Sequence, residues 1–133
     1  MGKAAMLCKT EQHAEEMVRI EAWRDEIEAG LLTIPGSLIN SAGAKRLPNV
    51  INIAFTGIKA ERLVSKLNDV IAFSVGSACA SAQQKASHVL QAMRIDKEVL
   101  EGSVRLSLGK MLRAEEVPLI MQQFKQAVTA LQQ

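Results

Sequence analysis

The sequence predicts one domain of the α/β or α+β class, in which helices pack on one side of a small sheet to form two layers. Its 133 residues fit a single domain, 1–133. Hydrophobic residues make up 48% and charged residues 23%, which is a globular composition. Helical and strand periodicities alternate along the chain. These patterns do not fix the strand directions, so both fold classes stay open.

Helical spacing of apolar residues predicts most of the helices. In the first, Met17, Ile20, Trp23 and Ile27 form an apolar stripe that Gly30 ends. The last has Glu115 and Glu116 at the positive end of its dipole. The short helix that begins at Ser87 is predicted from its cap, because the hydroxyl of Ser87 can accept a hydrogen bond from a backbone N–H of the first turn. The four expected helices are Met6–Ala29, the segment from Gly57 to Asn68, Ser87–Met93 and Ala114–Leu131.

Short segments rich in β-branched or alternating apolar residues predict three strands. The first places Ile51, Ile53 and Phe55 on one face and Asn52 and Ala54 on the other. The expected strands are Val50–Phe55, Val70–Val75 and Ser103–Leu108. Leu31–Asn49 holds two prolines and two glycines, so we expect a loop with at most a short strand near Leu31–Ile34.

Charge and hydropathy argue against two partner classes. The formal net charge is +2 and basic residues are interspersed with acidic ones, so no basic stripe indicates nucleic-acid binding. No apolar stretch is long enough to span a bilayer, which favours a cytoplasmic protein without membrane partners.

The cysteines and histidines give no metal or disulfide pattern. Cys8 and Cys79 lie far apart, so we expect two reduced thiols. Neither thiol lies at zinc-ligand spacing from His13 or His88, so no metal site is expected. Cys8 lies near the start of the first helix beside Met6 and Leu7, where we expect it to pack, and we expect neither it nor the two histidines to be catalytic.

Cys79 lies in a run of small residues, Gly76–Ala82, that has neither helical nor strand periodicity. We expect a mobile loop that exposes the sulfur, which is what a reactive thiolate requires. The alternative is that Cys79 is a small buried hydrophobe, as most free cysteines are.

Arg105 faces away from Val104, Leu106 and Leu108 in its predicted strand. A strand-held guanidinium can bind a carboxylate with two parallel hydrogen bonds, so Arg105 is a candidate anchor for an amino acid. A solvated strand face or an internal ion pair is the alternative. Taken alone, the sequence shows no complete catalytic constellation.

Four blocks resemble the NifS/IscS-type cysteine desulfurases, in the same order and at compatible spacing. Together they cover nearly the whole chain and form a specific signature. The blocks are Arg46-Leu47-Pro48-Asn49, Ser74 to Ala82, Ser87-His88-Val89-Leu90 and Ser103 to Lys110.

This resemblance implies the C-terminal small domain of a fold-type I pyridoxal-phosphate enzyme of the class V aminotransferase group. In that family the cofactor acts as an electron sink and a loop thiolate takes sulfur from cysteine, which leaves alanine and a protein persulfide. Cys79 matches the sulfur acceptor, and Arg105 matches the arginine that holds the substrate carboxylate. The persulfide then passes to an acceptor or scaffold protein, for iron-sulfur or other sulfur-transfer pathways.

The chain also departs from the family pattern. The large domain with the cofactor lysine has no counterpart, and Gln84-Lys85-Ala86 replaces a Leu-Glu-Pro-like stretch. We therefore expect a truncated domain that binds no pyridoxal phosphate, is inactive alone and tends to self-associate or form a homodimer. No lysine lies in a segment like the cofactor-lysine motif; the lysines are Lys3, Lys9, Lys45, Lys59, Lys66, Lys85, Lys97, Lys110 and Lys125.

Two alternative functions remain at this stage. The chain could be a non-enzymatic relay or docking module that accepts persulfide on Cys79 and hands it to iron-sulfur, thiouridine or DNA-sulfur machinery. It could also be a fragment of a related lyase or aminotransferase, although those relatives usually lack the cysteine loop.

Overall fold

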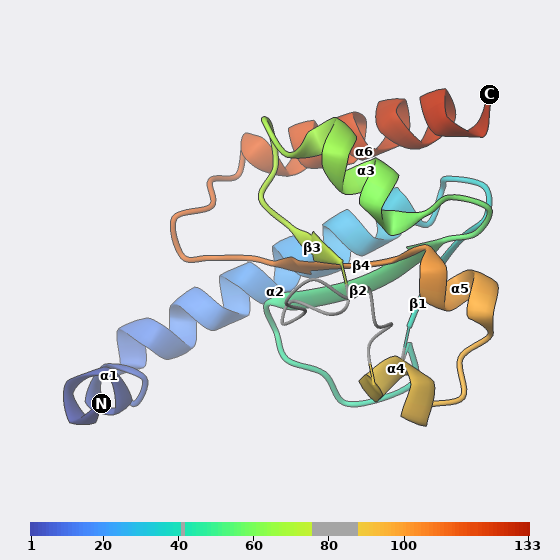
Figure 1. Ribbon diagram of the computed structural model, residues 1–133. Coiled ribbons are helices and arrows are strands. Elements are labelled where there is room, and N and C mark those ends of the chain that lie inside the picture. The colour runs from blue at the N-terminus through green and yellow to red at the C-terminus, as the bar shows by residue number, and fades with distance from the viewer. Residues whose placement is uncertain (41, 76–87) are drawn as a thin grey trace.

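The computed structural model describes residues 1–40, 42–75 and 88–133, which form helices on either side of an open sheet (Figure 1). The helices in this part of the chain are α1 (Gly2–Leu7), α2 (Glu11–Leu31), α3 (Ala60–Leu67), α4 (His88–Ala92), α5 (Lys97–Glu101) and α6 (Glu116–Gln132). The strands are β1 (Ser37–Ile39), β2 (Val50–Phe55), β3 (Ser74–Val75) and β4 (Ser103–Ser107). None of these helices is both long and apolar enough to cross a membrane.

The sheet has the strand order β1-β2-β4-β3, and all three strand pairs are antiparallel. The central pair aligns Ile53 with Val104 and Ile51 with Leu106. These four side chains are buried and point toward the helices. The mixed helix-and-sheet class predicted from the sequence is confirmed, and the open question of strand direction is answered by an antiparallel sheet.

The three longer helices cover the apolar face of the sheet. Helix α6 packs against both α2 and α3, and its Phe124 stacks on Phe55 of β2 with ring centroids 6.0 Å apart. Helices α4 and α5 lie on the other side of the sheet from α3 and α6 (Figure 1). The predicted two-layer packing therefore describes α2, α3 and α6, while the short helices add a partial cover to the second face.

The first predicted helix, Met6–Ala29, is wrong as a single element. Helix α1 ends at Leu7, and α2 begins at Glu11 after a break at Thr10. Thr10 is the cap of α2: its backbone is extended, and its hydroxyl oxygen accepts a hydrogen bond from the backbone N–H of His13 at 3.2 Å. A threonine in this position satisfies a first-turn donor, so it favours a new helix start.

The loop between α2 and β2 also differs from the prediction. No strand forms at Leu31–Ile34, because α2 continues to Leu31 and the next residues close it with turns, such as Ile34 N–H to Leu31 O at 3.1 Å. The short strand forms instead as β1, which pairs with β2. Helix α5 was not predicted, and β3 is shorter than the predicted Val70–Val75.

The remaining predicted elements agree well with the structure. Strand β2 matches its predicted bounds, and β4 ends one residue before the predicted Leu108. Helices α3 and α6 also form where they were expected. Helix α4 lies within the predicted Ser87–Met93, but its proposed cap, Ser87, lies outside the described residues.

Candidate functional site

A polar row crosses the face of the sheet opposite the helices α2, α3 and α6. We use this name for Asn40, Asn52, Arg105 and Ser74. The register pairs Asn52 with Arg105 and Arg105 with Ser74, and the Asn40 N–H donates to the carbonyl of Asn52 at 2.9 Å. Neighbouring strands lie about 4.8 Å apart, so the row brings together residues from four distant parts of the sequence.

Arg105 lies in the middle of the polar row, as its position in β4 predicted. Its register partners Asn52 and Ser74 flank it on both sides. The residue is half-buried, and within the described part of the chain its side chain makes no hydrogen bond or ion pair. A partly desolvated guanidinium with free donors is suited to bind a carboxylate. The alternative of an internal ion pair therefore finds no partner among these residues.

A hydrogen-bond network supports one end of the polar row. The side-chain nitrogen of Asn40 donates to Asn52 Oδ1 at 2.8 Å and to Ser103 Oγ at 2.9 Å. The Ser103 hydroxyl donates in turn to the carbonyl of Val99 in α5 at 2.7 Å. Asn40 and Ser103 are buried, so the network lies beneath the surface. The sequence analysis missed both residues, although Asn52 on the non-core face of an apolar strand was a signal.

The two cysteines lie in different parts of the chain. Cys79 lies outside the described residues, so its expected exposure and its role stay predictions. In sequence it follows Val75 of β3 by four residues. The expectation that Cys8 packs is wrong, because Cys8 is exposed at the end of α1. Helix α1 has no buried residue, so it offers no core for the thiol to enter.

The Arg46–Asn49 block is tied to both layers. Arg46 makes a bidentate ion pair with Glu28 of α2, with N–O distances of 2.6 and 3.0 Å. The side-chain nitrogen of Asn49 donates to the carbonyl of Leu108 at 3.3 Å, and Arg24 donates to the carbonyl of Leu47 at 2.9 Å. These contacts connect the loop before β2 to α2 and to the end of β4. The block therefore positions β2 and does not itself lie in the polar row.

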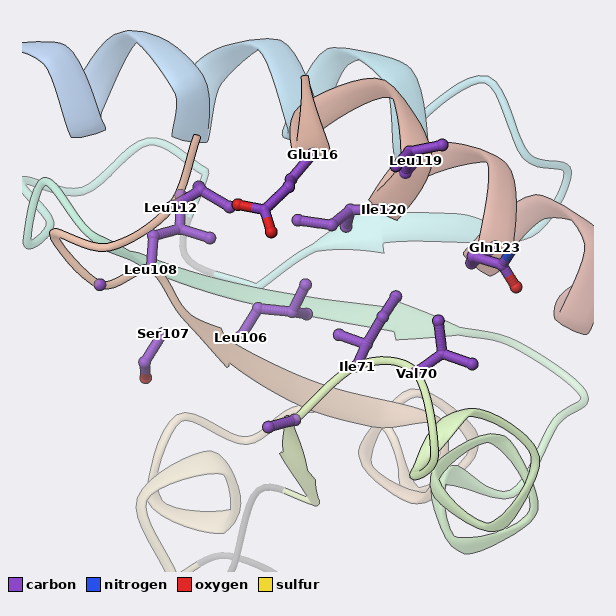
Figure 2. Close-up of a pocket in the computed structure, with 12 residues that line it drawn as sticks. Val70, Ile71, Leu106, Ser107, Leu108, Leu112, Glu116, Leu119, Ile120 and Gln123 are labelled. Carbon is purple, nitrogen blue, oxygen red and sulfur yellow. The ribbon is translucent and has the colours of Figure 1, made fainter. Parts of the chain in front are cut away.

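An apolar groove of about 310 Å³ opens between β4 and α6, on the side of the sheet that α2, α3 and α6 cover. Figure 2 shows Leu106, Ile71 and Ile120 pointing into this groove, with Glu116 at its rim. Because Leu106 points to the opposite face from Arg105, the groove is separate from the polar row. Among the residues that the structure describes, no group of three or more histidine, cysteine, aspartate or glutamate side chains lies close enough together to hold a metal ion.

Comparison with known proteins identifies the family. The family model for class-V aminotransferases matches residues 1–120, and the chain belongs to this family. A cysteine desulfurase IscS of Pasteurella multocida is 38% identical over 133 residues, which are the whole of this chain and 32% of the relative. A cysteine desulfurase of Enterobacter agglomerans is 39% identical over 98% of this chain and 33% of its own length. The chain thus spans about a third of the length of these relatives.

Solved structures agree with the sequence comparison. A NifS-like protein superposes with a TM-score of 0.76 and 26% identity, covering 91% of this chain and 30% of its own. A NifS-like protein from Rickettsia africae has the same fold, with a TM-score of 0.72 over 86% of this chain and 29% of its own. The resemblance to NifS/IscS-type cysteine desulfurases, predicted from four sequence blocks, is confirmed.

Proposed function

We propose that this chain is the C-terminal small domain of a cysteine desulfurase and that it contributes a carboxylate anchor and a sulfur acceptor. The observation that supports this most strongly is the setting of Arg105: a half-buried guanidinium, in the centre of the polar row, without a partner among the described residues. Its neighbour Ser74 begins the strand that leads in sequence to Cys79.

Each residue has a defined part in the proposed reaction. Arg105 binds both carboxylate oxygens of L-cysteine and so fixes the amino acid against the sheet. The Cys79 thiolate then forms a sulfur–sulfur bond to the substrate sulfur while the carbon–sulfur bond of the substrate breaks. The electron pair of the broken bond stays with the substrate carbon, which takes up a proton to give alanine, and the transferred sulfur remains on the protein as a persulfide.

We propose that this chain does not hold pyridoxal phosphate by itself. The family's cofactor supplies an electron sink and is held through a lysine. All lysines in the described ranges are exposed, and none belongs to the polar row; Lys85 lies outside those ranges. We therefore propose that another domain or chain holds the cofactor, so that this chain releases no sulfide from cysteine by itself.

We also propose that the persulfide passes to an acceptor or scaffold protein, and that the chain self-associates. Exposed apolar side chains such as Val70 and Leu119 near the groove support self-association. Light scattering of the purified chain tests it, and a monodisperse monomer would contradict it.

A chimera tests the proposed function. The matching third of the Pasteurella multocida IscS relative is replaced by this chain, and alanine and sulfide are measured with L-cysteine. We expect the chimera to be active. Cys79→Ser should abolish this activity and Cys8→Ser should leave it intact, while Arg105→Gln should raise the KM for L-cysteine. A Cys79→Ser chimera that still forms persulfide would contradict the proposal.

The separate chain distinguishes an enzyme domain from a sulfur relay. It is incubated with an intact desulfurase and L-cysteine, and its cysteines are analysed by mass spectrometry. If the separate chain gains a sulfur atom on Cys79 and the chimera has no activity, the result would favour the relay. An active chimera whose separate chain gains no sulfur supports the desulfurase domain.

A further inference from the structure

The network beneath the polar row fixes the direction of the Asn52 amide. The carbonyl oxygen of Val99 can only accept, so the Ser103 hydroxyl uses its one hydrogen to donate to it, at 2.7 Å. Ser103 Oγ must then accept from Asn40 Nδ2, at 2.9 Å. The second hydrogen of that nitrogen goes to Asn52 Oδ1, at 2.8 Å. A backbone carbonyl thus determines the orientation of three side chains.

Because Asn52 Oδ1 faces Asn40, the amide nitrogen of Asn52 lies at the other end of the group. This Nδ2 has two hydrogens to donate, and neither finds an acceptor in the described part of the chain. Asn40 is 3% exposed and Ser103 2% exposed. Turning the Asn52 amide around would leave buried donors without acceptors, so the observed orientation is strongly favoured.

Asn52 is the direct register partner of Arg105. Directly opposed residues of antiparallel strands have Cβ atoms about 5 Å apart and point to the same face. The free Asn52 nitrogen and the Arg105 guanidinium are therefore neighbouring groups that only donate. No described acceptor pairs with either group. A ligand with two anionic oxygens would satisfy both groups.

We infer that Asn52 Nδ2 donates a hydrogen bond to the α-carboxylate that Arg105 binds, and that Asn40 and Ser103 are the positioning residues that hold its amide. The inference deepens the proposed function and rests on it, since the ligand is the amino-acid substrate proposed there. It adds Asn52 as a ligand-contacting residue and explains why a network of neutral side chains is buried beside the arginine.

A nuclear magnetic resonance titration of the full chain with L-alanine tests this inference. The side-chain amide signals of Asn52 and the Nε–H signal of Arg105 should move along one common binding curve. L-Alaninamide, which has no carboxylate, should leave both unchanged. Asn52→Ala should weaken alanine binding about tenfold, the usual effect of losing a hydrogen bond to a charged group. Asn49→Ala is the matched control, because its amide nitrogen donates to the carbonyl of Leu108 and does not lie in the polar row.

Two further variants separate binding from folding. Asn52→Asp keeps the oxygen that Asn40 needs but replaces the donor with a carboxylate, so it should fold and lose alanine binding. Ser103→Ala should leave the Arg105 signal responsive while the preference for alanine over alaninamide falls. An unchanged preference in a folded Ser103→Ala chain would contradict its positioning role.

The outcomes distinguish this inference from the proposed function. If Arg105 responds to alanine and Asn52 does not, the inference is wrong and the carboxylate anchor stands. If neither signal responds, both the inference and the anchor role of Arg105 are wrong. Sulfur transfer to Cys79 in the chimera is measured separately and does not depend on Asn52 signals.

Discussion

The two faces of the central strands carry different chemistry on the same backbone. Toward the helices, Ile53 and Val104 oppose each other and are fully buried. Toward the other side, Asn52 and Arg105 oppose each other and are half-buried. Because side chains alternate along a strand, each strand serves the core with one set of residues and the polar row with the next.

This difference separates stability from ligand binding. Changes on the face that α2, α3 and α6 cover should mainly lower the free energy of unfolding, since they remove apolar contacts. Changes at the more exposed groups of the polar row should mainly alter binding. Changes in its buried network should alter both binding and the free energy of unfolding.

Phe124→Ala should have the largest effect. The Phe124 ring is fully buried and lies 5.1 Å from that of Phe73 and 6.0 Å from that of Phe55. Its removal should lower the free energy of unfolding by about 3–5 kcal/mol, measured by urea denaturation. Leu119→Ala, on the same helix but 53% exposed, should change it by less than about 0.5 kcal/mol. Equal losses for both would contradict the assignment of the core.

Gly102→Ala should be the next most damaging change. A Cβ atom there would collide with the backbone carbonyl of Phe55, which cannot move without disturbing β2. We expect a loss of about 3 kcal/mol, at the upper end for overpacking, measured by thermal unfolding. Gly43→Ala is the control, because nothing lies within 4 Å of the added atom. Similar melting temperatures for the two variants would show that β4 can shift.

Ser103→Ala tests the buried hydrogen-bond network beneath the polar row. It removes the acceptor of Asn40 and the donor to Val99, so we expect a loss of about 1–2 kcal/mol in chemical denaturation. Ser107→Ala is matched to it, since Ser107 lies on the same strand and face but is exposed. If both changes cost the same, the network adds no stability.

The exposed start of α6 should show the smallest effect, as a pH dependence. The side chain and backbone N–H of Arg113 hydrogen-bond to Glu116 and hold its pKa below the usual value. A carboxyl with a lowered pKa stabilises the folded state above its ordinary pKa, and this contribution is lost as the pH falls through the folded value. Because the pair is exposed, the effect is small and salt-sensitive.

Acid unfolding curves of wild type and Arg113→Gln measure this effect. The variant should lose less stability between neutral and acidic pH than the wild type does, because the side-chain part of the interaction that acid removes is already gone, while the backbone N–H of residue 113 still donates to Glu116. Identical curves at low salt would show that the Arg113 side chain adds nothing to the stability.

Local patterns in the sequence predicted much of this protein. The alternation in Val50–Phe55 and Ser103–Leu108 predicted the two central strands and the outward direction of Arg105. Apolar stripes predicted α3 and α6. Four sequence blocks predicted the family. These features depend on residues close together in the chain, where one periodicity decides which face is buried.

The strand order, the position of β1 and the network of the polar row depend on contacts between residues that lie far apart in the chain. Asn40 and Ser103 are 63 residues apart, and Arg46 and Glu28 are 18 apart. Their pairing follows from strand register and loop path, which no local period encodes. Alternation within each central strand was enough to predict which of its residues face the core and that Arg105 faces away from it. The antiparallel pairing of β2 with β4 decided which donors stand beside the guanidinium.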